Sequence, residues 1–107
     1  MLVSVTYSIR FDVVPEQQQR FLALLNALLD AMRFETTFRE AVLHRDPQSE
    51  CHYMLYETWE SHEEVMEVQL NRPYRQAWHE ALPELLRTPR DVAVWVPIRA
   101  DGQPPTC

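Results

Sequence analysis

The chain has 107 residues, 46% of them hydrophobic and 24% charged, which is the composition of one ordinary soluble globular domain. Its formal net charge of -6 argues against a nucleic-acid-binding or anionic-membrane-binding surface, because such surfaces need clustered Lys and Arg. Gly102 is the single glycine, so the glycine-rich phosphate loops of P-loop and Rossmann proteins are excluded.

The chain has two cysteines, Cys51 and Cys107, which lie far apart, and no residues follow the spacing of a metal site. We therefore expect neither a disulfide framework nor a bound metal. The first residues alternate between polar and apolar instead of forming the apolar core of a signal peptide. The longest apolar stretch, residues 21–32, is too short to span a bilayer. The default expectation is a cytoplasmic protein without a membrane segment.

A first strand is predicted over residues 3–11, because apolar and polar residues alternate there with the period of a half-buried strand. Pro15 and Glu16 end this strand and open a helix, since proline is tolerated in the first helical turn. The helix is predicted to face the core with apolar residues that recur at helical spacing: Phe21, Leu24, Leu25, Leu28, Leu29 and Met32.

Two further strands are predicted at residues 38–45 and 51–59, joined as a hairpin by the turn at residues 46–49. Ser61 and Glu64 then form the S-x-x-E pattern of a capping box, in which the serine accepts a bond from the glutamate N–H. A helix is therefore expected directly after Trp59 and up to about Asn71.

The next helix begins at Pro73 and presents an apolar stripe made of Tyr74, Ala77, Trp78, Ala81, Leu82 and Leu85. Pro83 lies inside this helix and has no N–H for the carbonyl of His79, so a kink or an early end is expected there. A last strand over residues 92–98 completes a domain of residues 1–99. Residues 100–107 are expected to form a flexible C-terminal tail.

The order of elements is βαββαβ, which predicts an α+β, ferredoxin-like fold: a four-stranded antiparallel sheet with both helical segments on one face. The other face of the sheet still carries apolar side chains and needs a cover. In so short a chain the expected cover is a second copy, which predicts a homodimer with the two sheets facing each other.

The strand that ends in Tyr56-Glu57-Thr58-Trp59, followed by two helices that Pro73 separates, resembles the antibiotic biosynthesis monooxygenase family. Pro15-Glu16 and the segment Leu43-His44-Arg45-Asp46-Pro47 resemble the family's pattern too, so the resemblance extends from about Val3 to Ile98. It implies a dimeric α+β barrel. It also implies a monooxygenase that uses molecular oxygen without a cofactor on a small aromatic or quinol-like substrate.

In the family, the tryptophan at the position of Trp59 lines the active-site pocket. The alternative role for Trp59 is that of a core aromatic that holds a helix on the sheet. Tyr53 lies on the same strand face by parity, so it is a second pocket candidate, with packing as its alternative role. Glu57, if buried, would be able to exchange a proton, with Arg39 or Arg75 as its partner.

The histidine that the family carries in the first of these two helices would fall near Val68 or Gln69. Gln69 is able to hydrogen-bond a substrate but not to exchange protons near neutral pH. His79 is therefore the predicted proton acceptor, with Trp59 as the other catalytic residue. His44 is the other possible substitute for the missing helix histidine, and a plain surface histidine is the alternative at position 79.

Haem binding, ligand binding without catalysis and isomerase activity remain open beside the monooxygenase. In the haem-degrading branch of the fold, a histidine at the place of His79 ligates haem iron and an asparagine lies near the position of Ser8. Ser8 lacks the amide and is kept as a polar substrate-binding candidate beside Tyr53, Trp59 and Gln69. A dimeric ligand-binding module and an isomerase of small metabolites also fit the fold, because a fold does not fix a function.

Overall fold

The computed structural model describes residues 3–102. Four strands and three helices follow one another in the predicted order, with short 3-10 turns at residues 15–17, 69–71 and 73–75: β1 Val5–Asp12, α1 Gln18–Met32, β2 Phe38–Arg45, β3 His52–Trp59, α2 His62–Glu67, α3 Gln76–Leu85 and β4 Asp91–Trp95. Within these residues no helix is long and apolar enough to cross a membrane.

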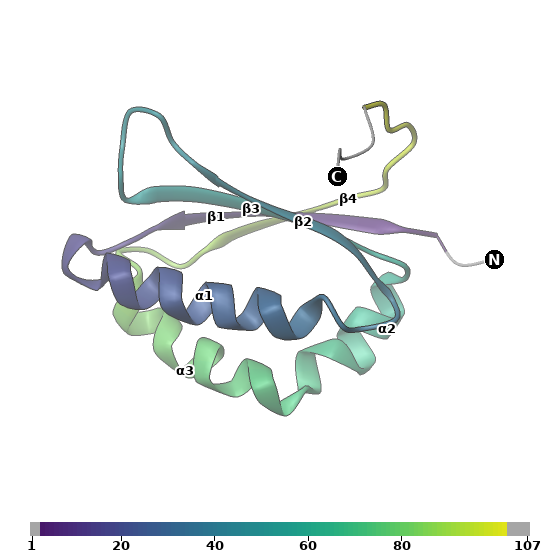
Figure 1. Cartoon of the computed structure of the whole chain (residues 1–107), viewed down its shortest axis with the longest axis horizontal. Helices are drawn as coiled ribbons and strands as arrows, with labels where there is room; N and C mark the ends of the chain where they lie inside the picture. Colours follow the sequence, from purple (N-terminus) through teal and green to yellow (C-terminus); the bar gives the residue numbers. More distant parts are fainter. Residues whose placement is uncertain (1–2, 103–107) are drawn as a thin grey trace, which may run out of the picture.

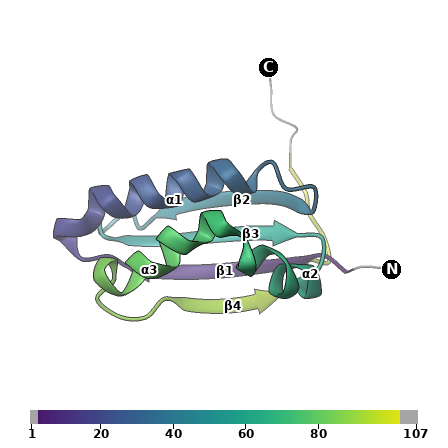
Figure 2. The same cartoon turned by 90° about the horizontal axis from the view of Figure 1, so that it is seen from below.

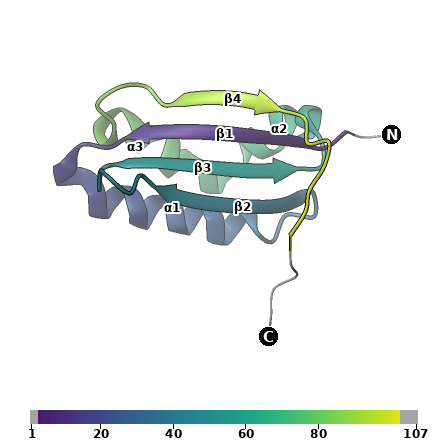
Figure 3. The ribbon, with the colours of Figure 1, turned by 90° about the horizontal axis from the view of Figure 1, so that it is seen from above.

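The strands form one antiparallel sheet in the order β2-β3-β1-β4, and all three helices lie on the same face of it (Figures 1 and 2). The predicted ferredoxin-like fold is therefore confirmed. The opposite face, which we call the open face, has no helix on it. After β4 the chain crosses this open side at the end of the sheet where β3 ends (Figure 3).

The strand register decides which side chains meet below the helices. Tyr7 on β1 lies opposite Glu57 on β3, which in turn lies opposite Ala41 on β2. On the other side of β1, Tyr7 lies opposite Val94 of β4. These four residues form one row across the sheet. Because alternate residues of a strand face the same side, the row faces the helices together with positions 5, 9, 55 and 59.

Aromatic side chains fill the core at both ends of the sheet. At one end, the ring of Phe21 from α1 lies 5.1 Å from Phe11, 5.0 Å from Tyr53 and 5.7 Å from Trp78. At the other end, Trp59 packs edge-on against Phe38 at 5.2 Å. The Phe21 contacts hold α1 against the sheet, and the ring of Trp78, 5.7 Å from Phe11, does the same for α3.

The ends of some elements differ from the prediction. The helix after Trp59 is interrupted at Val68, so that α2 is followed by a separate 3-10 turn. Pro83 does not end α3, which continues to Leu85, because Pro83 is exposed in the last turn and the helix buries Leu82 and Leu85 beside it. The last strand ends at Trp95 and not near position 98. Residues 103–107 of the expected tail, with Cys107, lie outside the described residues.

The predicted cap of α2 is half confirmed. The Glu64 N–H donates to Oγ of Ser61 at 3.3 Å. The carboxylate of Glu64 does not return to Ser61, however, but accepts hydrogen bonds from Thr37 at 2.9 Å and from Gln69 at 3.1 Å. The capping glutamate therefore ties α2 to the loop before β2.

Candidate active site

A cavity of about 160 Å³ lies between the sheet and the helices. Apolar side chains from the sheet and from all three helices make most of its wall. Five polar residues share this lining: Tyr7, Glu57, Arg75, His79 and Arg90. Met66 and Val92 also line it and are exposed, so they mark the side on which it reaches solvent. Apolar walls with a few convergent polar groups are the usual composition of a ligand site.

Glu57 is a buried carboxylate, only 6% exposed, in the middle of the sheet. Its Oε1 accepts a hydrogen bond from Nε1 of Trp59 at 3.0 Å. Burial raises the pKa of Glu57, while the indole N–H and the charges of Arg75 and Arg90 act in the opposite direction. Glu57 therefore keeps its proton up to a higher pH than a surface glutamate does.

Arg75 is a buried guanidinium, also 6% exposed, just before α3. Its central carbon lies 5.8 Å from the ring centre of Trp59 and 6.0 Å from that of Tyr74, which is the geometry of cation–π contact. Nε and Nη2 are buried, and neither has a hydrogen-bond partner among residues 3–102. Two donors of a fixed planar group are therefore left without a hydrogen bond next to the cavity.

His79 lies one helical turn after Arg75 and is half-buried. Burial lowers the pKa of His79, and the positive charges of Arg90 and Arg75 lower it further. The imidazole is therefore uncharged at neutral pH, which is the form that accepts a proton.

Tyr7 contributes a phenol to the same cavity. Its hydroxyl is hydrogen-bonded to Nδ1 of His62 at 2.7 Å, although His62 is otherwise exposed at the start of α2. Burial, and then the negative charges of Glu57 and Glu63, raise the pKa of Tyr7 to about 12. The phenol therefore stays protonated at any physiological pH.

Among the five residues predicted for the site, only His79 lines the cavity. Trp59 is fully buried behind it, in contact with Glu57 and Arg75. Gln69 is bonded to Glu64 and to the Tyr74 hydroxyl, at 3.1 and 3.3 Å.

Tyr53 and Ser8 lie further away. Tyr53 packs at the far end of the core and accepts a hydrogen bond from Gln18 at 2.9 Å. Ser8 lies on the open face, where it accepts a hydrogen bond from Nε1 of Trp95 at 3.0 Å.

Two signals in the sequence point to the residues that the predicted site left out. Tyr7 and Glu57 occupy the same alternation as the apolar residues of their strands, so parity directs both toward the core. Arg75 and His79 are separated by four positions, which places them on one face of a helix. A charged residue in such a core-facing position is a candidate for function.

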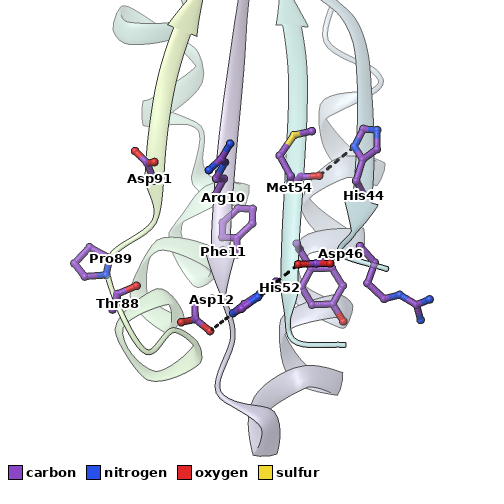
Figure 4. A pocket seen from close by; sticks show the side chains of 12 residues that line it. Arg10, Phe11, Asp12, His44, Asp46, His52, Met54, Thr88, Pro89 and Asp91 are labelled. Carbon is purple, nitrogen blue, oxygen red and sulfur yellow. Dashed lines mark hydrogen bonds and ion pairs between the residues drawn. The ribbon is translucent and has the colours of Figure 1, made fainter. Parts of the chain in front are cut away.

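A second hollow, of about 480 Å³, lies at the end of the sheet where β1 ends and β3 begins (Figure 4). His52 lies between two carboxylates there, with Nε2 3.2 Å from Asp12 and Nδ1 3.8 Å from Asp46. His44, the other substitute predicted for the missing helix histidine, contacts the carbonyl of Met54 at 3.2 Å. Because most of these polar side chains are exposed, the buried cavity is the better candidate site.

The sequence pattern of antibiotic biosynthesis monooxygenases matches residues 4–81. A protein of Pestalotiopsis microspora named "Putative monooxygenase GME11364" is 32% identical in an alignment of 95 positions that covers 86% of this chain and 78% of that protein.

Two solved structures are similar in fold. SnoaB of Streptomyces nogalater, described as a cofactor-independent oxygenase, has a TM-score of 0.78 at 17% identity, covering 92% of this chain and 96% of its own. Rv0793 of Mycobacterium tuberculosis has a TM-score of 0.82 at 23% identity, covering 92% of this chain and 99% of its own. The match to more than half of the chain shows that the protein belongs to the antibiotic biosynthesis monooxygenase family.

Proposed function

We propose that this protein is a cofactor-independent monooxygenase that oxidises a small, ionisable aromatic compound in the buried cavity. The observation that carries the proposal is that an uncharged imidazole, His79, and the guanidinium of Arg75, with two unbonded donors, line the same apolar cavity. The name of the related monooxygenase and the description of SnoaB as a cofactor-independent oxygenase support the same reaction class.

In the proposed reaction, His79 takes the proton of a phenol hydroxyl, and Arg75 stabilises the phenolate that forms. The electron-rich anion passes one electron to dioxygen, and the resulting substrate radical and superoxide combine into a carbon–oxygen bond. The hydroperoxide then loses water and leaves a quinone, so that a phenol and dioxygen become a quinone and water. Arg75 and Arg90 contribute most while the substrate is negative, because a low-dielectric cavity strengthens their attraction.

Trp59 acts in this proposal as a positioning residue. Its N–H holds the carboxylate of Glu57, and its ring lies against the guanidinium of Arg75. Gln69 has a similar place, since it fixes the hydroxyl of Tyr74, whose ring also lies against Arg75.

Haem binding is not favoured by the size of the cavity. A volume of about 160 Å³ is close to that of a cavity that holds benzene, whereas haem is a macrocycle of four pyrrole rings. A haem bound to His79 would therefore have to extend well beyond this cavity.

Oxygen consumption tests the proposed reaction. The purified protein is incubated with a panel of single-ring phenols and hydroquinones, and oxygen uptake and quinone formation are compared with uncatalysed oxidation. We expect uptake above that background with at least one compound, and a large loss in His79→Ala. His44→Ala is the matched control because His44 is exposed on the open face. Absence of uptake with every compound would show a binding module or an isomerase instead, and full activity of His79→Ala would remove the role of His79.

We also propose that a second copy of the chain covers the open face. Apart from the segment that crosses one end, no other element covers this face in residues 3–102 (Figures 1 and 3). Trp95 on β4 is 60% exposed on it, and Val42 is exposed on β2 at the opposite edge of the sheet. Burying such side chains against their own copies is the usual way in which an apolar sheet face is removed from water.

A further inference from the structure

We propose that Arg75 anchors the negatively charged oxygen of the ligand and that the cavity accepts the phenolate of a single aromatic ring, excluding fused ring systems. This inference rests on the proposed function only for its choice of site. It specifies which ligand binds there, whether or not that ligand reacts with oxygen.

The first argument is the state of the Arg75 side chain. A buried N–H without a partner costs free energy, and two such donors on one guanidinium are uncommon in a folded protein. Glu57, the carboxylate of the same cavity, makes no ion pair with Arg75, and its Oε1 is occupied by the indole of Trp59. Arg75 lines the cavity while its Nε and Nη2 lack hydrogen-bond partners, and a ligand oxygen is the partner that we infer for this guanidinium.

The second argument is the balance of charge around the cavity. Two guanidinium groups, Arg75 and Arg90, line it together with one carboxylate, Glu57. The other two polar residues are uncharged near neutral pH, since the pKa of His79 is lowered and the pKa of Tyr7 is raised to about 12. Even with Glu57 ionised, the lining carries one unpaired positive charge, and an anion of charge -1 neutralises it.

The third argument is volume. The cavity measures about 160 Å³, and an apolar protein cavity of about 150 Å³ binds benzene. One aromatic ring with its oxygen therefore fills the space. The ring would lie against apolar side chains from both layers of the fold: Ile9, Leu28, Leu55, Val65, Leu70 and Trp78. A fused second ring does not fit within this volume and would have to project past Met66 and Val92 into solvent.

Binding of 4-nitrophenol without oxygen tests the proposal, because the ionised form of this single-ring phenol absorbs visible light. We expect the protein to bind it and to increase the ionised fraction at constant pH. Two comparison ligands separate charge from size. 4-Nitroanisole, which has no proton to lose, is expected to bind about tenfold or more weakly, and 4-nitro-1-naphthol, with two fused rings, is expected not to bind.

Arg75→Met removes the donors and keeps an unbranched apolar chain of similar length. We expect it to weaken binding of 4-nitrophenolate by about 10- to 100-fold, to leave 4-nitroanisole unchanged, and to unfold at a temperature no lower than the wild type. Arg75→Lys keeps the charge without the fork and should bind with intermediate affinity. Arg20→Met is the control, because Arg20 lies outside the cavity in an exposed ion pair with Glu84.

Three results would overturn the proposal: no binding of 4-nitrophenol, equal binding of the naphthol, or unchanged phenolate affinity in both Arg75 variants. None of these measurements involves oxygen. Selective binding without oxygen uptake would therefore refute the monooxygenase and leave the anion site standing. Oxygen uptake that does not depend on Arg75 would refute the anion site and would be consistent with the monooxygenase.

Discussion

The indole N–H of Trp59 donates a hydrogen bond to the carboxylate of Glu57 at 3.0 Å, and both side chains are buried below the helices. The two residues are neighbours on one face of β3, and Trp59 also lies against Arg75. The tryptophan that the sequence singles out thus contacts two polar residues of the cavity without lining the cavity itself.

Trp59→Phe keeps an aromatic ring and removes the N–H. We expect the free energy of unfolding to fall by about 1.5–3 kcal/mol, because the buried carboxylate loses a donor to a charged group. Urea denaturation measures this change. In the background of Glu57→Gln the same substitution should cost less, since the acceptor is then neutral. Equal costs in both backgrounds would show that packing, and not the hydrogen bond, is what Trp59 contributes.

Glu57→Gln should stabilise the protein at neutral pH. Burial raises the pKa of Glu57 in the folded state, so the unfolded state releases the proton at lower pH than the folded state does. The stability of the wild type therefore falls as pH rises above the usual glutamate pKa of 4.5.

Urea denaturation between pH 4 and pH 8 tests this dependence. The advantage of Glu57→Gln should be smallest at pH 4 and should grow toward pH 8. Glu84→Gln, at an exposed glutamate, should show no such trend. An advantage of Glu57→Gln that stays constant with pH would contradict the raised pKa.

Tyr7 should remain protonated well above the usual pKa of a phenol. Burial and two nearby carboxylates raise its pKa from 10.0 to about 12, so its contribution to stability is complete below pH 10 and is lost between pH 10 and about pH 12. NMR titration of labelled tyrosine rings measures this value. Glu57→Gln should bring it down, because one of the two charges is removed.

The hydrogen bond between Tyr7 and His62 should contribute modestly to stability. Tyr7→Phe and His62→Ala each remove one partner, and we expect a loss of about 0.5–1.5 kcal/mol for each. If the bond is the cause, the double variant should lose less than the sum of the two, and full additivity would show that the 2.7 Å contact contributes nothing.

Trp95→Asp should dissociate the proposed dimer. Trp95 is exposed on the open face, so a carboxylate there would be buried without a partner if two sheets faced each other. Sedimentation analysis should show a dimer for the wild type and a monomer for the variant. Phe34→Asp is the matched control, since Phe34 is 83% exposed at the end of α1. A monomeric wild type would refute the dimer.

Local patterns in the sequence were enough to predict the sheet, the helices and the faces that they bury. The alternation in β1 and the stripe of α1 both have the period of their element, and Ser61 caps α2 because its partner is three residues away. Such signals depend on neighbours in the chain. They carry no information on which distant residue completes a contact, and so Glu64 bonds to Thr37 and Gln69 instead of returning to Ser61.

The sequence by itself therefore determined the family, the ferredoxin-like topology and the apolar faces that form the core. Only the tertiary structure decided which polar groups share the cavity. The pairing of β1 with β3 places Tyr7 beside Glu57, and the packing of α3 on the sheet brings Arg75 and His79 to the same space. The physical reason is that burial arises only when elements far apart in the chain pack together. Burial leaves Nε and Nη2 of Arg75 without hydrogen bonds and shifts the pKa values of Glu57 and His79.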